Sequence, residues 1–184
     1  MSDKSEQTTG GAWMRDHFMM MAAYNRWCNE RIYDAAARLS DADYRADLGA
    51  FFKSVHGTLN HILVGDRVWL SRFTRSGPVP TALNEILYDD FDGLSAARRE
   101  EDGRIAAYVE RLDWDNFQSI LHYRALSRPD EVSLPLVTAL HHFFNHQTYH
   151  RGQVTALLTR LNGASPPIDL LYYALETGDG LRPT

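Results

Sequence analysis

Apolar residues recur at steps of three and four over most of the chain, a spacing that predicts amphipathic helices rather than strands. The pattern indicates four long helices, over about residues 13–39, 52–73, 94–112 and 135–161. The last of these has clear ends, because Pro135 is favoured at the start of a helix and Asn162-Gly163 is a strong stop signal. The predicted fold is therefore all-α, a four-helix bundle.

The connections between these helices differ in length. About a dozen residues join the first helix to the second, which allows more than a simple up-and-down arrangement. Within that connection, Ser40 and Asp41 can cap a short turn. After the second helix, Gly77 and Pro78 break the helical pattern and open a loop that runs to about Asp90. We therefore expect a bundle with mixed-length connections.

The remaining segments are short. Residues 117–134 alternate in character on both sides of the turn signal Ser127-Arg128-Pro129-Asp130, which predicts a small hairpin. Asp169 can cap a short C-terminal helix. The first dozen residues are polar and Gly-rich, so we interpret residues 1–12 as a flexible leader. Residues 13–184 contain no internal repeat and are expected to form a single helical bundle domain.

Composition and charge narrow the possible functions. Of the 184 residues, 44% are apolar and 23% are charged, as in an ordinary folded globular protein. The net charge of −5, without a dense basic block, argues against nucleic acid as a partner. The charged string over residues 98–104 is expected to lie on a solvated helix face. The sequence has no apolar stretch long enough for a membrane span and no signal-peptide pattern, so we expect a cytoplasmic protein.

Cysteine usage excludes two kinds of site. Cys28 is the only cysteine, so the chain can form neither an intramolecular disulfide nor a Cys-rich zinc site. Because Cys28 lies in a stretch with helical spacing, we interpret it as a plain buried or half-buried thiol.

Histidines are the most informative residues of this sequence. His142, His146 and His150 follow one another at steps of four in the last long helix, so neighbours in the series share a helix face. Two imidazoles on consecutive turns can hold one divalent ion, but a tight site needs a third ligand from another helix. His56 and His61 are five residues apart and so point in different directions. The second helix offers four candidates for the third ligand, namely His56, Asn60, His61 and Asp66.

The sequence around these histidines resembles a known signature. Residues 55–70 (VHGTLNHILVGDRVWL) and residues 143–153 (FFNHQTYHRGQ) closely resemble the motifs of the DinB family, in the DinB/YfiT-like superfamily. Residues 24–30 of the first helix also look like the family's opening. The resemblance extends over about residues 13–177.

This resemblance implies a fold, a metal site and an assembly. The family has a four-helix bundle, usually a homodimer, in which three histidines hold a divalent ion such as nickel or zinc. The family's histidine on the second helix matches His61, and its pair on the last helix matches His146 and His150. Other members of the superfamily include mycothiol-dependent maleylpyruvate isomerase and bacillithiol S-transferase, which this chain resembles in fold and triad only.

Several neighbouring residues have more than one possible role. His142 could replace one histidine of the 146/150 pair, act as a weak candidate for a catalytic or pocket group, or be structural. Asn60 and Gln153 are candidates to accept a hydrogen bond from a ligand imidazole. Asp66 could orient a ligand histidine, act as a weak candidate for a catalytic base, or pair with Arg67, Arg72 or Arg151.

The sequence therefore predicts a divalent-metal-binding protein that acts as a metal-dependent enzyme. Its open three-histidine site would serve a thiol S-transferase or a hydrolase. The substrate would be a small molecule, with a low-molecular-weight thiol as a candidate co-substrate. No evident carboxylate ligands accompany the histidines, which disfavours magnesium and calcium.

Two other readings compete with the enzyme. The first is a non-catalytic dimeric metal-binding protein, in stress response or interaction, whose ion braces the bundle. A fourth ligand from His142 or Asp66 would favour it, because structural metal sites tend to be closed. The second is a DNA-binding repair factor, which the acidic net charge disfavours.

Overall fold

The computed structural model describes residues 2–126 and 130–179 of the protein, with side chains from Gly10 onward in those ranges. The fold is mostly helical, as predicted, with one small sheet. The elements in chain order are α1 (Ser2–Ala36), α2 (Asp41–Arg45), α3 (Val55–Thr74), α4 (Phe91–Val109), α5 (Trp114–Gln118), β1 (Ile120–Arg124), β2 (Glu131–Pro135), α6 (Leu136–Asn162) and α7 (Leu170–Thr177).

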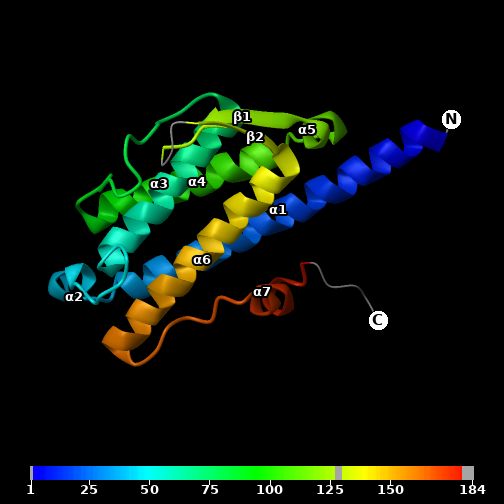
Figure 1. Ribbon diagram of the computed structural model, residues 1–184. Coiled ribbons are helices and arrows are strands. Elements are labelled where there is room, and N and C mark those ends of the chain that lie inside the picture. Colours follow the sequence, from blue (N-terminus) through cyan, green and yellow to red (C-terminus); the bar gives the residue numbers. More distant parts are fainter. Residues whose placement is uncertain (1, 127–129, 180–184) are drawn as a thin grey trace.

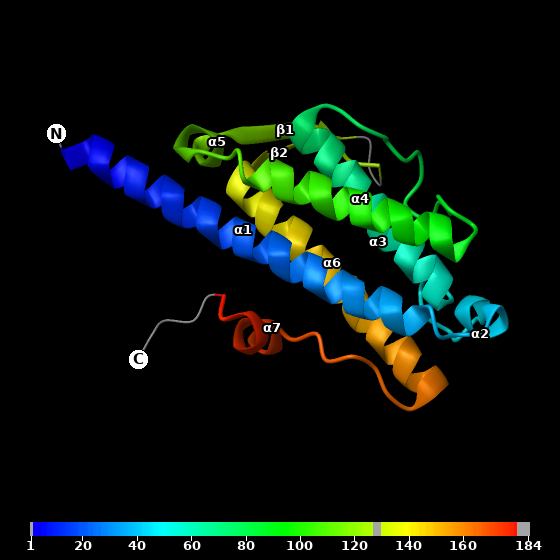
Figure 2. The same ribbon diagram turned by 180° about the vertical axis from the view of Figure 1, so that it is seen from behind.

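The four long helices form a bundle in which α1 packs against α4 and α6, and α3 packs against the same two helices. Helices α1 and α3 are therefore diagonally opposite. Figures 1 and 2 show that α3 and α4 point in the same direction, because the loop between them returns along the length of the bundle. The arrangement is thus not a simple up-and-down bundle, and this crossover loop, residues 75–90, passes beside α3.

The predicted helices are confirmed, with shifted ends. Ser54 caps α3 by accepting a hydrogen bond from the Gly57 amide, and Asp90 caps α4 through the Gly93 amide. These caps move the two helix starts by about one turn from the predicted positions. Helix α6 stops at Asn162 as predicted, because Gly163 adopts the left-handed conformation with φ of 73°.

Helix α1 begins well before the predicted start at Trp13, since it runs from Ser2. Its early part packs closely on α5. A Cβ on Gly10 would lie 3.0 Å from the ring of Trp114, and one on Gly11 would lie 3.1 Å from the Trp114 Cβ. The glycine pair that suggested a leader therefore permits a close helix contact. The division into a flexible leader and a single domain remains a prediction.

The predicted hairpin and C-terminal helix are both present. Strands β1 and β2 pair antiparallel, with Ile120 opposite Pro135 and Arg124 opposite Glu131. The predicted turn residues 127–129 lie outside the described residues. Asp169 is at the N-cap of α7, but its side chain makes no capping hydrogen bond. The short helix α5, which leads into the hairpin, was not predicted.

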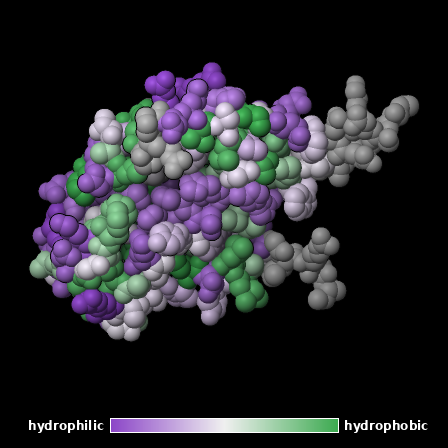
Figure 3. Space-filling view, in the orientation of Figure 1, coloured by the Kyte–Doolittle hydropathy of each residue, from purple (hydrophilic) through white to green (hydrophobic). Residues whose placement is uncertain are grey.

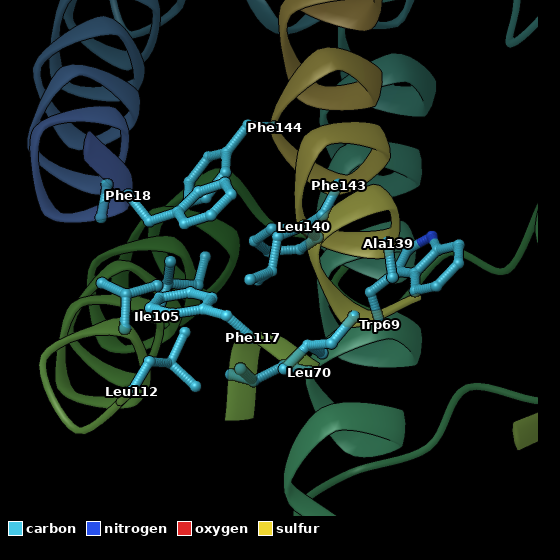
Figure 4. Packing of buried hydrophobic residues seen from close by; sticks show 13 residues of the cluster. Phe18, Trp69, Leu70, Ile105, Leu112, Phe117, Ala139, Leu140, Phe143 and Phe144 are labelled. Carbon is cyan, nitrogen blue, oxygen red and sulfur yellow. The ribbon is translucent and has the colours of Figure 1, made fainter. Parts of the chain in front are cut away.

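Apolar side chains fill the bundle in two main clusters. Figure 4 shows the first, in which Phe18, Ile105 and Phe144 converge from α1, α4 and α6. The second cluster lies further along the same four helices and includes Ile32 and Leu63. A third, smaller cluster includes Cys28, which is fully buried as expected for a plain thiol. None of the helices in the described part of the chain is both long and apolar enough to cross a membrane.

A layer of buried polar side chains separates the two main clusters. At its centre, Arg98 contacts Asp66 and lies 3.0 Å from an oxygen of Asp102. Asn25 and Asn29 donate hydrogen bonds to Asp102, at 3.2 and 2.9 Å. All four long helices contribute to this polar layer, which comprises Asn25, Asn29, Asp66, Arg98, Asp102, Gln147 and Arg151.

The polar layer corrects two sequence-based predictions. Residues 98–104 do not form a solvated string, because Arg98, Glu101 and Asp102 are only 2%, 1% and 5% exposed. At 3.6 residues per turn these positions share the inner face of α4. Arg98 pairs there with Asp66 and Asp102, and Glu101 pairs with Arg67 and Arg104. Asp66 pairs with Arg98 rather than with any of the three arginines that were predicted as partners.

We expect Arg98→Met to lower the free energy of unfolding by about 3–5 kcal/mol, because it leaves two buried carboxylates without their cation. Chemical denaturation at neutral pH measures this loss. Arg99→Met is the matched control, since Arg99 is the next residue and forms only a hydrogen bond to Ser95. A loss below about 1 kcal/mol for Arg98→Met would contradict the central role of the polar layer.

Candidate metal centre

Helices α3 and α6 bring three histidines together. His61, His146 and His150 each offer one nitrogen, and these nitrogens all lie within 4.8 Å of one another. The two Nε2 atoms of His61 and His150 are 3.2 Å apart. His61 and His150 are buried, and His146 is half-buried. The step of four residues on α6 places two of the rings on one face, and α3 supplies the third ring from across the helix interface.

Hydrogen bonds determine where the protons of two of these rings lie. The Nδ1 of His61 is 2.7 Å from the carbonyl oxygen of Leu83, which can only accept, so Nδ1 donates. The Nδ1 of His150 likewise donates to Oε1 of Gln153 at 2.9 Å. Both Nε2 atoms then carry lone pairs that face each other without a proton between them. A cation relieves this repulsion.

The arrangement fits a metal ion in two further respects. Two nitrogens that each lie about 2.0–2.1 Å from one tetrahedral ion are about 3.3 Å apart, close to the spacing of the two Nε2 atoms. The Nδ1 of His146 is also buried without a hydrogen-bond partner among the described residues. The three-histidine cluster can therefore hold a metal ion with an all-imidazole set of ligands.

Burial keeps the three imidazoles neutral. It lowers the pKa of His61 to about 4, against the opposing effect of the Leu83 carbonyl. It lowers the pKa of His146 to about 3, assisted by the neighbouring His150 and His61. The pKa of His150 is also lowered by burial, although its hydrogen bond to Gln153 acts in the other direction. Neutral rings at physiological pH have the free lone pairs that metal ligation requires.

Two other contacts position the rings. Phe52 stacks on His61, with ring centroids 3.7 Å apart and planes within 16°. Gly65 of α3 leaves room for His146, because a Cβ at this glycine would lie 2.9 Å from the Cε1 of that ring. Sequence analysis missed Phe52, Gly65 and Leu83 as site residues. Only Gly65 gave a signal, since a glycine inside a helix needs a packing reason.

Of the two residues expected to accept a hydrogen bond from a ligand imidazole, one does so. Gln153 accepts from His150 as expected. Among the described residues, no cluster imidazole donates to the side chain of Asn60; its Oδ1 instead accepts from the amides of Leu87 and Tyr88, at 2.9 and 3.0 Å. Asn60 thus anchors the crossover loop that carries Leu83. His56 points elsewhere, as predicted, and lies 3.1 Å from the carbonyl of Tyr88.

The two weak catalytic candidates lie outside the cluster. The ring of His142 is 5.7 Å from that of His146 and packs against Trp69 at 5.0 Å. Asp66 belongs to the polar layer, where it contacts Arg98 and accepts from Gln147. Burial raises the pKa of Asp66, while these two contacts oppose the rise. In the described part of the chain, no fourth His, Cys, Asp or Glu joins the cluster.

Comparisons with known proteins agree with these features. A model of the DinB family matches residues 7–180 of the chain. The chain is 25% identical over 173 residues to Protein DinB of Bacillus subtilis (strain 168), covering 89% of this chain and 97% of that protein. No solved structure gave a significant match.

Gly65→Ala should weaken metal binding without unfolding the protein. The added methyl displaces the His146 ring, while alanine itself favours the helix by up to about 1 kcal/mol. We expect an affinity for zinc about tenfold lower or worse, measured by equilibrium dialysis, with no loss of thermal stability in the metal-free protein. Gly152→Ala is the control, because a Cβ there meets no atom within 4 Å. Equal zinc affinity in both variants would show that Gly65 does not position His146.

Zinc affinity should change little between about pH 7 and pH 5. Protons compete with the ion only near or below the pKa of a ligand. Burial moves the pKa values of His61 and His146 to about 4 and about 3, and it also lowers the pKa of His150. Dialysis across this range measures the dependence. An affinity that already falls steeply below about pH 6.5 would mean that the histidines keep their ordinary pKa.

Proposed function

The chain belongs to the DinB family, and we propose that it is a metal-dependent enzyme whose ion is held by His61, His146 and His150. The observation that carries this proposal is the 3.2 Å approach of the Nε2 atoms of His61 and His150, with a nitrogen of His146 within 4.8 Å of both ligand nitrogens. The Nδ1 contacts of His61 and His150 favour tautomers that leave both Nε2 atoms without a proton. A divalent ion bound there would supply Lewis acidity, polarising a water or thiol group brought to it. The protein's own residues hold the three rings and fix their tautomers.

An enzyme is favoured over a bracing role because the cluster offers three protein ligands. Structural zinc sites usually have four, whereas catalytic sites keep a position for water or substrate. Asp66 and His142, the two residues that could have closed the site, both have other contacts. An open position is therefore the expected state of the loaded site.

Nickel and zinc are the ions that we propose. Neutral imidazoles suit both, and no carboxylate accompanies the described cluster to favour magnesium or calcium. For the reaction, we propose thiol S-transfer to a small molecule ahead of hydrolysis, because the superfamily that the chain resembles includes thiol-dependent enzymes.

We further propose a cytoplasmic homodimer. Large apolar side chains remain exposed on α7, where Leu171 and Leu175 are 63% and 62% exposed, and Met19 of α1 is 40% exposed. A second copy of the chain is the partner that the family resemblance suggests for such surfaces.

The test of the site is the metal content of tag-free protein, measured by elemental mass spectrometry. We expect about one nickel or zinc ion per chain in the wild type and almost none in His61→Ala or His146→Ala. His122→Ala is the matched control, because His122 lies on the hairpin and bonds to Ser133. No uptake by the wild type, even after zinc or nickel is added, would refute the proposed site.

The loaded protein then distinguishes the proposed activity from the non-catalytic alternative. Transfer of a low-molecular-weight thiol to an electrophile, or hydrolysis of an ester or amide, should depend on the ion and disappear in His61→Ala. An ion that is bound and raises the melting temperature without either activity would favour the bracing role.

A further inference from the structure

Arg72, on the last turn of α3, packs against two aromatic rings that contact each other. Its guanidinium carbon lies 4.7 Å from the ring centre of Trp69 and 4.3 Å from that of Tyr123 on β1. Stacking of this kind fixes the plane of a guanidinium and leaves its edge, with the N–H groups, available. The hairpin therefore orients an arginine at the end of α3.

This arginine has no carboxylate partner in the described part of the chain. Arg45, Arg98 and Arg104 each lie within 3.0 Å of a carboxylate oxygen, but no such oxygen lies within 4.0 Å of Arg72. Its one hydrogen bond is long, 3.4 Å, to the carbonyl of Arg124. Partial burial lowers the pKa of Arg72, because no anion offsets its desolvation. A half-buried cation with free donors can bind an external anion.

A row of rings leads from Arg72 to the metal centre. His142 packs on the same Trp69 ring, at 5.0 Å, and lies 5.7 Å from the ring of His146. His142 also lines a groove of about 720 Å³ between α1, α6 and the start of α7, together with Asn145 and Thr148. Figure 3 shows a hydrophilic band on this face, where α6 crosses the molecule in Figure 1. The contacts of Arg72 with Trp69, of Trp69 with His142 and of His142 with His146 therefore join the arginine to the three-histidine cluster.

We propose that Arg72 binds a carboxylate group of the substrate whose reacting end lies at the three-histidine site. The inference rests on the proposed function and deepens it, since it makes the substrate an organic acid and Arg72 a specificity-determining residue. A carboxylate fits because its two oxygens match the paired N–H groups on the exposed edge of one guanidinium. His142, the exposed ring of this row, would lie beside the bound substrate.

The first test uses zinc-loaded protein and a series of ω-mercaptoalkanoic acids of increasing chain length, with ω-mercaptoalcohols of equal length as neutral controls. The thiol anchors each probe at the ion, and calorimetry gives the affinity. We expect the acid to bind about tenfold tighter than the alcohol, or better, once the chain is long enough to reach Arg72. Mercaptoalkylphosphonates of the same lengths test whether Arg72 prefers a phosphonate to a carboxylate.

Arg72→Met should abolish this preference and keep its zinc, because methionine retains an apolar stem against the two rings. Arg38→Met is the matched control, an exposed arginine just after α1 for which no carboxylate partner is described, and should bind like the wild type. A preference that persists in Arg72→Met, or is absent from the wild type at every chain length, would overturn the proposal. A stronger Arg72-dependent preference for the phosphonate would overturn the assignment to a carboxylate.

A second measurement separates this proposal from the metal site. In metal-free protein, benzoate should shift the side-chain Nε–H resonance of Arg72 in a nuclear magnetic resonance titration, whereas benzamide should not. The shift is expected even if the wild type binds no ion, in which case only the proposed function fails. No shift with benzoate would refute anion binding by Arg72.

Discussion

The buried contact of Arg98 with Asp66 and Asp102 is the interaction on which the arrangement of the four helices depends. Apolar clusters on either side of it can pack in several similar ways, because the hydrophobic effect is not directional. Buried charges are different, since each one that loses its partner destabilises the fold strongly. The position that α1, α3, α4 and α6 adopt is the one in which every member of the polar layer finds an oppositely charged or hydrogen-bonding neighbour.

The same layer sets the geometry of the metal centre. Gln147 donates to Asp66 at 2.7 Å, and it is the residue after His146. Arg151, which follows His150, donates to Asn25 on α1. These contacts with α3 and α1 fix the rotation of α6 about its own axis and its position along the bundle. His146 and His150, which precede Gln147 and Arg151, then face His61 of α3 on the outer side of the same helix pair. Stability of the bundle and preorganisation of the site therefore depend on one set of contacts.

The crossover loop contributes the second constraint on the site. Because α3 and α4 run in the same direction, the loop must return along α3, and Asn60 holds it there through the amides of Leu87 and Tyr88. The carbonyl of Leu83 then reaches the Nδ1 of His61 and leaves Nε2 free for an ion. A topology with a short loop at this point could not supply that carbonyl. The hairpin acts similarly at the other end of α3, where it orients Arg72.

The sequence by itself determined the long helices and the hairpin, because helical periodicity and glycine and proline signals are local properties. From a step of four residues the sequence offered His142, His146 and His150 as ligands, and it singled out His61, His146 and His150 only through the family resemblance. It could not determine that Arg98, Glu101 and Asp102 are buried, since a charged string looks the same whether its partners are water or other helices. It also gave no sign of the role of Leu83, because a backbone carbonyl has no side-chain signature. Those features, and the unpaired state of Arg72, depend on contacts between segments far apart in the chain, which only the tertiary structure decides.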